Sequence, residues 1–260
     1  MKAIQELIGI MAALRDPVTG CPWDRQQTME TIIPYTLEEI YELVDAIERN
    51  STEDIMDELG DLLFHIIFYS HMAAEAGSFE FTDVVSGVCE KLVRRHPHVF
   101  AGQRVDTVEE VKRNWGKMKR EESGGDYLGN IAGALPALQR AEKLQKRAAR
   151  AGFDWDDPAP VLAKVEEEIN ELKQGMAGSE ERSRLQSELG DVLFAAVNLA
   201  RHLQVNPETA LRGANNRFEQ RFRFIQTKLE EAGEDLESAS LERMDELWEE
   251  AKIKFHKSGA

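Results

Sequence analysis

Apolar residues recur at intervals of three and four along most of the chain, which is the spacing of one helix face at about 3.6 residues per turn. The segment TEDIMDELGDLLFHIIFYSHMAAEAG follows this pattern, and we expect a helix from a cap at Ser51 or Thr52 to Gly77. SRLQSELGDVLFAAVNLARHLQV is its counterpart later in the chain. Alternating apolar and polar runs bounded by hairpin turns are absent from the sequence. The pattern therefore predicts an all-α fold.

Two other segments add to this picture. The N-terminal MKAIQELIGIMAALRDP has polar residues at helical spacing, so we expect an amphipathic helix there and no signal sequence. LPALQRAEKLQKRAARAGFDW predicts a helix with Pro136 near its start and Gly152 at its end. The most apolar segment, LLFHIIFYSHMAA, contains two histidines and is shorter than the ~20 residues that a membrane-spanning helix needs. We therefore expect no association with a membrane.

The helical pattern occurs twice. LEEIYEL at 37–43 matches EEEINEL at 166–172 in five of seven positions, and DELGDLLF at 57–64 matches SELGDVLF at 187–194 in six of eight. Weaker matches follow in the same order, from Trp23 with Trp155 to Trp115 with Trp248. A repeat of this length indicates a duplicated structural unit. We predict two tandem helical bundles.

The connection between the copies is polar and rich in glycine. REESGGDYLGN at 120–130 contains adjacent glycines and several charges, which are typical of an exposed connection. We therefore predict an N-terminal domain over 1–120, a linker over 121–134 and a C-terminal domain over 135–260.

The charge composition indicates which binding partners to expect. The 48 acidic residues outnumber the 32 basic ones and give a formal net charge of −16. Such a field repels phosphate backbones and anionic lipids, so we expect no nucleic-acid partner, although a local cationic pocket or a bridging metal can still hold one phosphate ester. Cys21 and Cys89 form no disulfide framework, which favours a reducing compartment, and we expect a cytoplasmic protein.

The repeated acids are the strongest candidates for chemistry. At helical spacing Glu38, Glu39 and Glu42 share one side of a helix, and Glu58 and Asp61 share one side of the next. Solvated helix faces are the simple explanation, but apolar residues cover most of the second helix and leave little of it for water. Carboxylates gathered at low dielectric need a compensating cation. A set of oxygen ligands with no cluster of His or Cys favours Mg²⁺ over zinc.

Basic and aromatic residues extend this candidate site. Lys91 and Arg95 in the first copy, and Arg217 and Arg221 in the second, are spaced one helical turn apart and suit phosphate oxygens. Trp115 with Lys119, and Trp248 with Lys252, suit a nucleotide base and a phosphate. Solvated basic residues and a tryptophan packed in the core remain the alternatives for these positions.

The motif EExxE followed by ExxD, present twice, with GCPWD near the start and RRHPHVF in the first half, resembles the MazG family of the all-α NTP pyrophosphatase superfamily. The resemblance covers nearly the whole chain. It implies a homodimer of helical bundles that hydrolyses nucleoside triphosphates, ATP included, to the monophosphate and pyrophosphate. It also implies Mg²⁺ as the cofactor, with Mn²⁺ as a substitute.

The resemblance further implies a role for each matching residue. In the second copy the metal ligands are Glu168, Glu171, Glu188 and Asp191, and with Glu167 beside them they form the catalytic set. The phosphate contacts are Lys164, Arg217, Arg221 and Lys252, and Trp248 contacts the base. In the first copy the metal positions are Glu39, Glu42, Glu58 and Asp61, with Glu38 alongside.

The two copies differ in one cation. Lys164 lies one helical turn before Glu168, whereas Tyr35 holds the equivalent place before Glu39. We therefore expect the second copy to carry most of the activity. The alternative function is a nucleotide-binding regulatory or interaction protein without efficient turnover. A P-loop enzyme is disfavoured because no Walker-type glycine loop is present.

Overall fold

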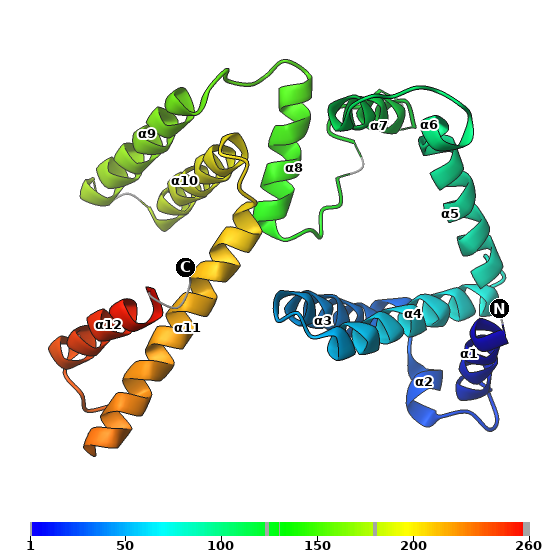
Figure 1. Ribbon diagram of the computed structural model, residues 1–260, viewed down its shortest axis with the longest axis horizontal. Coiled ribbons are helices and arrows are strands. Elements are labelled where there is room, and N and C mark those ends of the chain that lie inside the picture. The colour runs from blue at the N-terminus through cyan, green and yellow to red at the C-terminus, as the bar shows by residue number, and fades with distance from the viewer. Residues whose placement is uncertain (1, 123–124, 130, 179–180, 257–260) are drawn as a thin grey trace. The chain divides into compact units, whose positions relative to one another are not determined.

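The computed structural model describes residues 2–122, 125–129, 131–178 and 181–256, and within these ranges the regular structure is helical (Figure 1). The all-α prediction is confirmed. The chain divides into two compact units, unit 1 over 1–115 and unit 2 over 116–260. The helices are α1 Lys2–Leu14, α2 Pro22–Gln26, α3 Met29–Glu48, α4 Thr52–Glu75, α5 Phe81–Arg95, α6 Pro97–Phe100, α7 Val108–Glu122, α8 Ala137–Arg150, α9 Pro158–Ala177, α10 Arg182–His202, α11 Pro207–Ala232 and α12 Leu241–His256.

Unit 1 is built on a hairpin of α3 and α4, with α1 packed against α4. Asn50, at a φ of 55°, makes the turn between the two long helices, and the Ser51 amide donates to the carbonyl of Ala46. Ser51 is the N-cap of α4, and Gly77 adopts a φ of 66° just after its end. The helix expected between these two residues is therefore confirmed.

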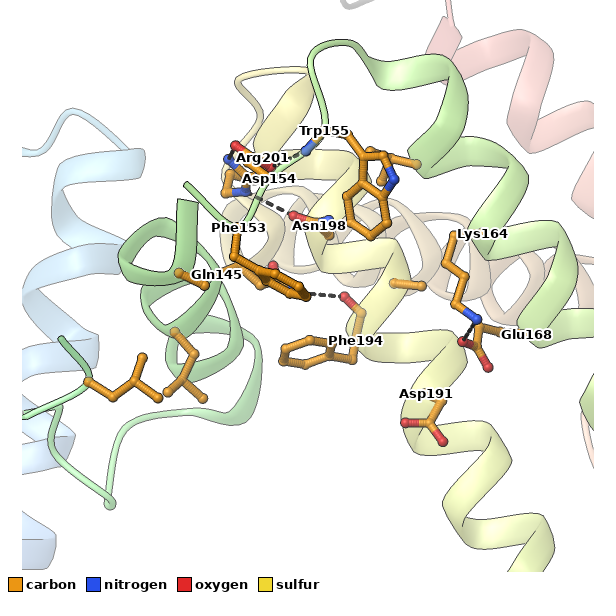
Figure 2. A pocket seen from close by; sticks show the side chains of 15 residues that line it. Gln145, Phe153, Asp154, Trp155, Lys164, Glu168, Asp191, Phe194, Asn198 and Arg201 are labelled. Atoms are coloured by element: carbon orange, nitrogen blue, oxygen red, sulfur yellow. Dashed lines mark hydrogen bonds and ion pairs between the residues drawn. The ribbon is translucent and has the colours of Figure 1, made fainter. Parts of the chain in front are cut away.

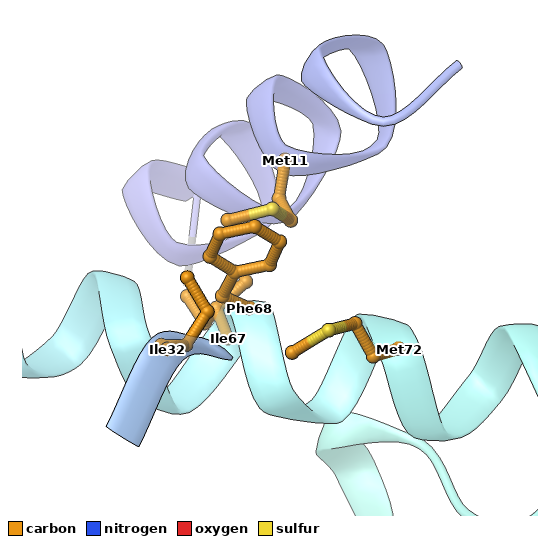
Figure 3. Packing of buried hydrophobic residues seen from close by; sticks show 5 residues of the cluster. All are labelled: Met11, Ile32, Ile67, Phe68 and Met72. Carbon is orange, nitrogen blue, oxygen red and sulfur yellow. The ribbon is translucent and has the colours of Figure 1, made fainter. Parts of the chain in front are cut away.

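The core of unit 1 lies where α1, α3 and α4 meet. Figure 3 shows Met11, Ile32, Ile67, Phe68 and Met72 packed together, and all five are buried. The members of α4 recur at helical spacing, so one face of that helix closes the core. This packing fixes α4 and, through it, the acidic side that α4 shares with α3.

Unit 2 contains the matching hairpin of α9 and α10, and α8 packs against α10 and α11. Pro136 is the N-cap of α8, and Gly152 follows its end at a φ of 90°, as the sequence predicted. The Arg147 guanidinium donates to the carbonyls of Tyr127 and Gly129, which ties the segment before α8 to that helix.

The second half of unit 2 is the pair of α11 and α12. Gly233, at a φ of 72°, ends α11 in the left-handed conformation that favours glycine. Ile225 and Leu229 of α11 pack against Leu247 of α12 and form a second, smaller core. Among the described helices, none is both long and apolar enough to cross a membrane.

We predict that Phe68→Ala lowers the free energy of unfolding by about 3 to 5 kcal/mol, because it leaves a cavity in a fully buried site. Urea denaturation followed by circular dichroism measures this change. Phe153→Ala is the matched control, since Phe153 is 79% exposed and its truncation leaves no buried void. Equal losses in the two variants would contradict the assignment of Phe68 to the core.

Candidate active site

Each hairpin brings carboxylates from two facing helices together. In unit 2, Glu168 and Glu171 of α9 and Glu188 of α10 each offer an oxygen, and these oxygens lie within 4.8 Å of one another. In unit 1, Glu39 of α3 does the same with Glu58 and Asp61 of α4. The structure thus assembles two oxygen-only groups from residues that the repeated motifs selected.

The remaining predicted acids lie at the edges of these groups. Asp191 lines a cavity beside Glu168. Glu38 and Glu42 lie with Glu58 around a shallow acidic hollow on unit 1. Glu167 is exposed on α9 and accepts an ion pair from Lys164.

Two carboxyl groups of unit 1 have pKa values above the usual range. Burial raises the pKa of Glu39 to about 7, and the charge of Asp61 is the next largest cause. Burial also raises the pKa of Glu58, followed by the charge of Glu42. Glu39 therefore keeps its proton up to a higher pH than an ordinary carboxyl group does, and it donates a hydrogen bond to Glu58. A hard divalent cation fits such a group, because it favours the ionised form of every carboxylate around it.

Unit 2 carries its own cation. The Lys164 Nζ lies 2.8 Å from a Glu167 oxygen and 2.9 Å from a Glu168 oxygen. Hydrogen bonds to Glu167 and Glu168 raise the pKa of Lys164, so it stays charged. Tyr35, which holds the equivalent place in unit 1, instead lies edge-on to Trp23 at 5.5 Å between ring centroids. The predicted difference between the copies is thus visible as an ion pair in one and an aromatic pair in the other.

A cavity of about 420 Å³ opens beside the acids of unit 2. Figure 2 shows Lys164, Glu168 and Asp191 toward one end, and Phe153, Trp155 and Phe194 toward the other. The walls come from α8, α9 and α10 and from residues 153–155 between α8 and α9, called the FDW segment below.

An ion pair holds the FDW segment against α10. The guanidinium of Arg201 pairs with both oxygens of Asp154, and the Nε2 of His202 lies 3.0 Å from one of them. The Arg201 hydrogen bond is the main cause that lowers the pKa of Asp154, so this carboxylate is ionised at neutral pH. The ion pair anchors the segment to α10 and keeps Trp155 in the cavity wall.

The residues of α11 and α12 that are predicted to contact the phosphates and the base lie outside this cavity. Arg217 borders a separate hollow on α11, and Lys252 pairs with Glu249 at 2.5 Å. The Arg221 Cζ lies 5.3 Å from the ring centroid of Trp248, which also packs against the second core. Of the four predicted phosphate contacts, only Lys164 lines the cavity within one chain. The roles of Arg217, Arg221 and Lys252, and of Trp248 as the base contact, stay predictions.

Among the corresponding residues of the first copy, Trp115 makes structural contacts. The Trp115 Nε1 donates to the carbonyl of Arg95 at 2.8 Å, and its ring meets His96 edge-on. Lys91 is exposed on α5, and the side chain of Lys119 lies outside the described residues. Trp115 therefore supports the packing alternative for the aromatic positions.

Sequence reasoning missed the polar residues at the aromatic end of the cavity. Gln145 of α8 and Asn198 of α10 line it and are both buried. A signal for Asn198 was present, because the repeat pairs it with Phe68 and so places a polar residue on an apolar face. Gln145 falls in a part of the chain where the two copies have no readable match.

Comparisons with known proteins agree with this geometry. The family model described as "MazG nucleotide pyrophosphohydrolase domain" matches twice, at residues 27–100 and 157–223, and each match contains one acidic hairpin. The chain is 46% identical over 257 residues to the nucleoside triphosphate pyrophosphohydrolase of Escherichia coli K12, an alignment that covers 97% of this chain and 98% of that protein. It is 42% identical over 251 residues to the nucleoside triphosphate pyrophosphohydrolase/pyrophosphatase MazG of Thermotoga maritima, with 95% of each covered.

Fold and site define a duplicated all-α protein with a carboxylate group in each copy. The chain belongs to the MazG nucleotide pyrophosphohydrolase family, whose named relatives are hydrolases of phosphoanhydride bonds. The family resemblance seen in the motifs is confirmed.

We predict that, in metal-free protein, the stability of unit 1 decreases as pH rises from about 4.5 to about 7. In this window the unfolded chain releases the proton of Glu39 while the folded chain keeps it, so ionisation favours the unfolded state. The loss levels off above the folded pKa.

Urea midpoints measured in EDTA at pH 5 and pH 7.5 check this prediction. Glu39→Gln, which cannot titrate, reduces the fall between the two pH values, whereas the exposed control Glu53→Gln leaves it unchanged. An undiminished fall in Glu39→Gln would show that other groups cause the pH dependence.

Proposed function

We propose that this protein hydrolyses nucleoside triphosphates to nucleoside monophosphate and pyrophosphate, and that the reaction depends on Mg²⁺, with Mn²⁺ as a substitute. The observation that carries the proposal is the group of Glu168, Glu171 and Glu188, with Lys164 at the mouth of a cavity large enough for a nucleotide. The activity for which its relatives are named supports it.

The roles follow from what phosphoryl transfer requires, which is positioning and neutralisation of charge. Glu168, Glu171, Glu188 and Asp191 would hold the metal. A bound divalent ion supplies charge neutralisation on the triphosphate and acidifies a coordinated water. Lys164 stabilises the negative charge that develops on the phosphates. Glu167, exposed next to Lys164, or another carboxylate beside the metal ligands would accept the proton of the attacking water.

The second copy is proposed to perform most of the catalysis. It combines an acidic group, a lysine paired to that group and an adjoining cavity. In the first copy a tyrosine replaces the lysine, and the acids face an open hollow that Arg49 also lines. The first copy can still bind a divalent cation, which would remove the repulsion within its carboxylate group.

We predict that Glu171→Gln abolishes turnover, because it removes one oxygen ligand from the group in the active copy, whereas Glu42→Gln leaves most of it. Several nucleoside triphosphates are incubated with and without Mg²⁺, and anion-exchange chromatography identifies the products. Monophosphate plus pyrophosphate is expected only with metal.

The reverse ranking of the two variants would assign catalysis to the first copy. Diphosphate plus orthophosphate from the unmodified protein would contradict the proposed reaction. Nucleotide that binds tightly but is recovered unchanged would identify a regulatory nucleotide-binding protein.

We also propose that the protein is a homodimer. The acidic hairpins expose large apolar side chains, among them Ile33, Leu37 and Ile40 of α3, Leu59 and Ile66 of α4, and Leu189 and Leu193 of α10. Apolar side chains gathered on one surface are typical of an interface with another chain.

We predict that light scattering coupled to size exclusion gives twice the mass of one chain, because a second copy covers these apolar side chains. Leu189→Glu shifts the population toward monomer, since it places a charge in the interface. Lys173→Glu, at an exposed polar position of α9, is the control and leaves the mass unchanged. A single-chain mass for the unmodified protein would contradict the dimer.

A further inference from the structure

The acidic hairpin of unit 2 has a closed end and an open end. The chain itself joins α9 to α10 between Ala177 and Arg182, which is the closed end. At the open end α9 begins at Pro158 and α10 ends at His202. The carboxylates of the two helices repel one another, so a hairpin held only at its closed end would separate at the other. Contacts at the open end therefore help to determine how far apart the acids lie.

An ion pair joins the two helices at this open end. Figure 2 shows Arg201 beside Asp154, and its guanidinium donates from two nitrogens to the two oxygens of that carboxylate. The Nε2 of His202 lies 3.0 Å from one of the same oxygens. Asp154 precedes the first residue of α9, whereas Arg201 and His202 are the last two residues of α10. The three side chains are only 9% to 26% exposed, so solvent screens this pair less than a surface ion pair. We call Asp154 and Arg201 the clamp of unit 2.

Unit 1 has an ion pair at the same end of its hairpin. Arg15 donates from its Nε and Nη2 to the two carboxylate oxygens of Glu75, at 2.9 and 2.7 Å, and Glu75 is the last residue of α4. The Nη1 of Arg15 donates to the carbonyls of Asp24 and Gln27, which lie just before α3. Arg15 therefore holds the end of α4 to the segment that leads into α3.

The two ion pairs use their residues in opposite ways. In unit 2 the helix end supplies the arginine, whereas in unit 1 it supplies the acid. The repeat pairs Arg201 with His71, which lies one turn before Glu75 and contacts it at 3.4 Å. Different residues thus join the same two ends of the hairpin. This indicates that the hairpin needs the joint itself and not one particular side chain.

We propose that Asp154 and Arg201 are positioning residues for the reaction, because their ion pair sets the spacing of α9 and α10 and so the affinity of the unit 2 carboxylate group for a divalent cation. Roughly 15 to 20 Å along each helix separates the clamp from the acids, so neither residue is a metal ligand. Ligands that are already held in place bind a metal more tightly than ligands that must be brought together. The inference rests on the proposed function, since it assumes that this group holds the metal of the reaction.

Binding of Mn²⁺ to the protein without nucleotide tests this role, and it separates the clamp from any contact of Arg201 with substrate. Free Mn²⁺ gives an electron paramagnetic resonance signal that is lost on binding. Glu39→Gln with Glu58→Gln removes the competing group of unit 1. In that background we expect Arg201→Glu to raise the dissociation constant for Mn²⁺ at least about tenfold, as is typical when a group that orients metal ligands is lost. The new carboxylate repels Asp154 and opens the hairpin.

A double variant provides the rescue. Asp154→Arg combined with Arg201→Glu restores the ion pair with its charges exchanged, which is the arrangement that unit 1 already uses. We expect it to recover most of the lost Mn²⁺ affinity. Arg223→Glu is the matched control, because it makes the same change of charge at a side chain of α11 that is 75% exposed, and it leaves Mn²⁺ binding unchanged.

The spacing of the helices is measured directly by dipolar coupling between spin labels at Ala163→Cys of α9 and Ala196→Cys of α10, both exposed positions, after the two native cysteines are replaced by serine. Labelled protein is diluted with unlabelled protein, so that only distances within one chain are seen. We expect a narrow distance distribution with the clamp intact, a broad one in Arg201→Glu and a narrow one again in the double variant.

An unchanged Mn²⁺ dissociation constant or an unchanged distance distribution in Arg201→Glu would overturn the proposal, and so would a loss that the double variant does not reverse. If circular dichroism shows that Arg201→Glu is unfolded, Asp154→Asn decides, because it keeps the shape of the side chain and removes its charge. Weaker Mn²⁺ binding is expected there, and unchanged binding would again overturn the proposal. Absence of hydrolysis in the product assay, with these Mn²⁺ results as expected, would count against the proposed reaction alone.

Discussion

Repulsion between carboxylates is the constraint on which both units depend. Each hairpin places acidic oxygens from two helices within 4.8 Å of one another, although like charges at that distance disfavour each other strongly. In unit 1 the core behind the hairpin holds the helices together in spite of this cost. In unit 1 the repulsion is relieved by a proton on Glu39, and in unit 2 by the ammonium of Lys164. A divalent cation is a third way to offset this repulsion, because it attracts every carboxylate of a group at once.

The two copies therefore share a hairpin but differ around it. The acids are kept in register, whereas Tyr35 of the first copy corresponds to Lys164 of the second, and Phe68 corresponds to Asn198. Both differences make the second copy more polar, and Lys164 and Asn198 both line its cavity. The ion pair of Asp154 with Arg201 then supports the polar side chains by fixing the FDW segment over them.

Much of this was predictable from the sequence because it depends on local periodicity. The spacing of apolar residues set the long helices, and the repeated EExxE and ExxD motifs selected acids that do converge. Arg217, Arg221, Trp248 and Lys252 show the limit. Their spacing places them on helices α11 and α12, but where those helices lie relative to the hairpin depends on packing that no local pattern encodes. Gln145 was missed for the same reason, since only the contact of α8 with α10 brings it into the cavity wall.

The filled core of unit 1 has a consequence for how the chain tolerates change. A hollow lined by amides forgoes the packing energy that Phe68 and Met11 supply in the other copy. Binding sites are commonly less stable than the best-packed version of the same fold. In this chain the two demands fall on different copies, because apolar side chains fill the region in the first copy and a cavity remains there in the second. Substitutions in the wall of the unit 2 cavity therefore leave the packing of the unit 1 core unchanged.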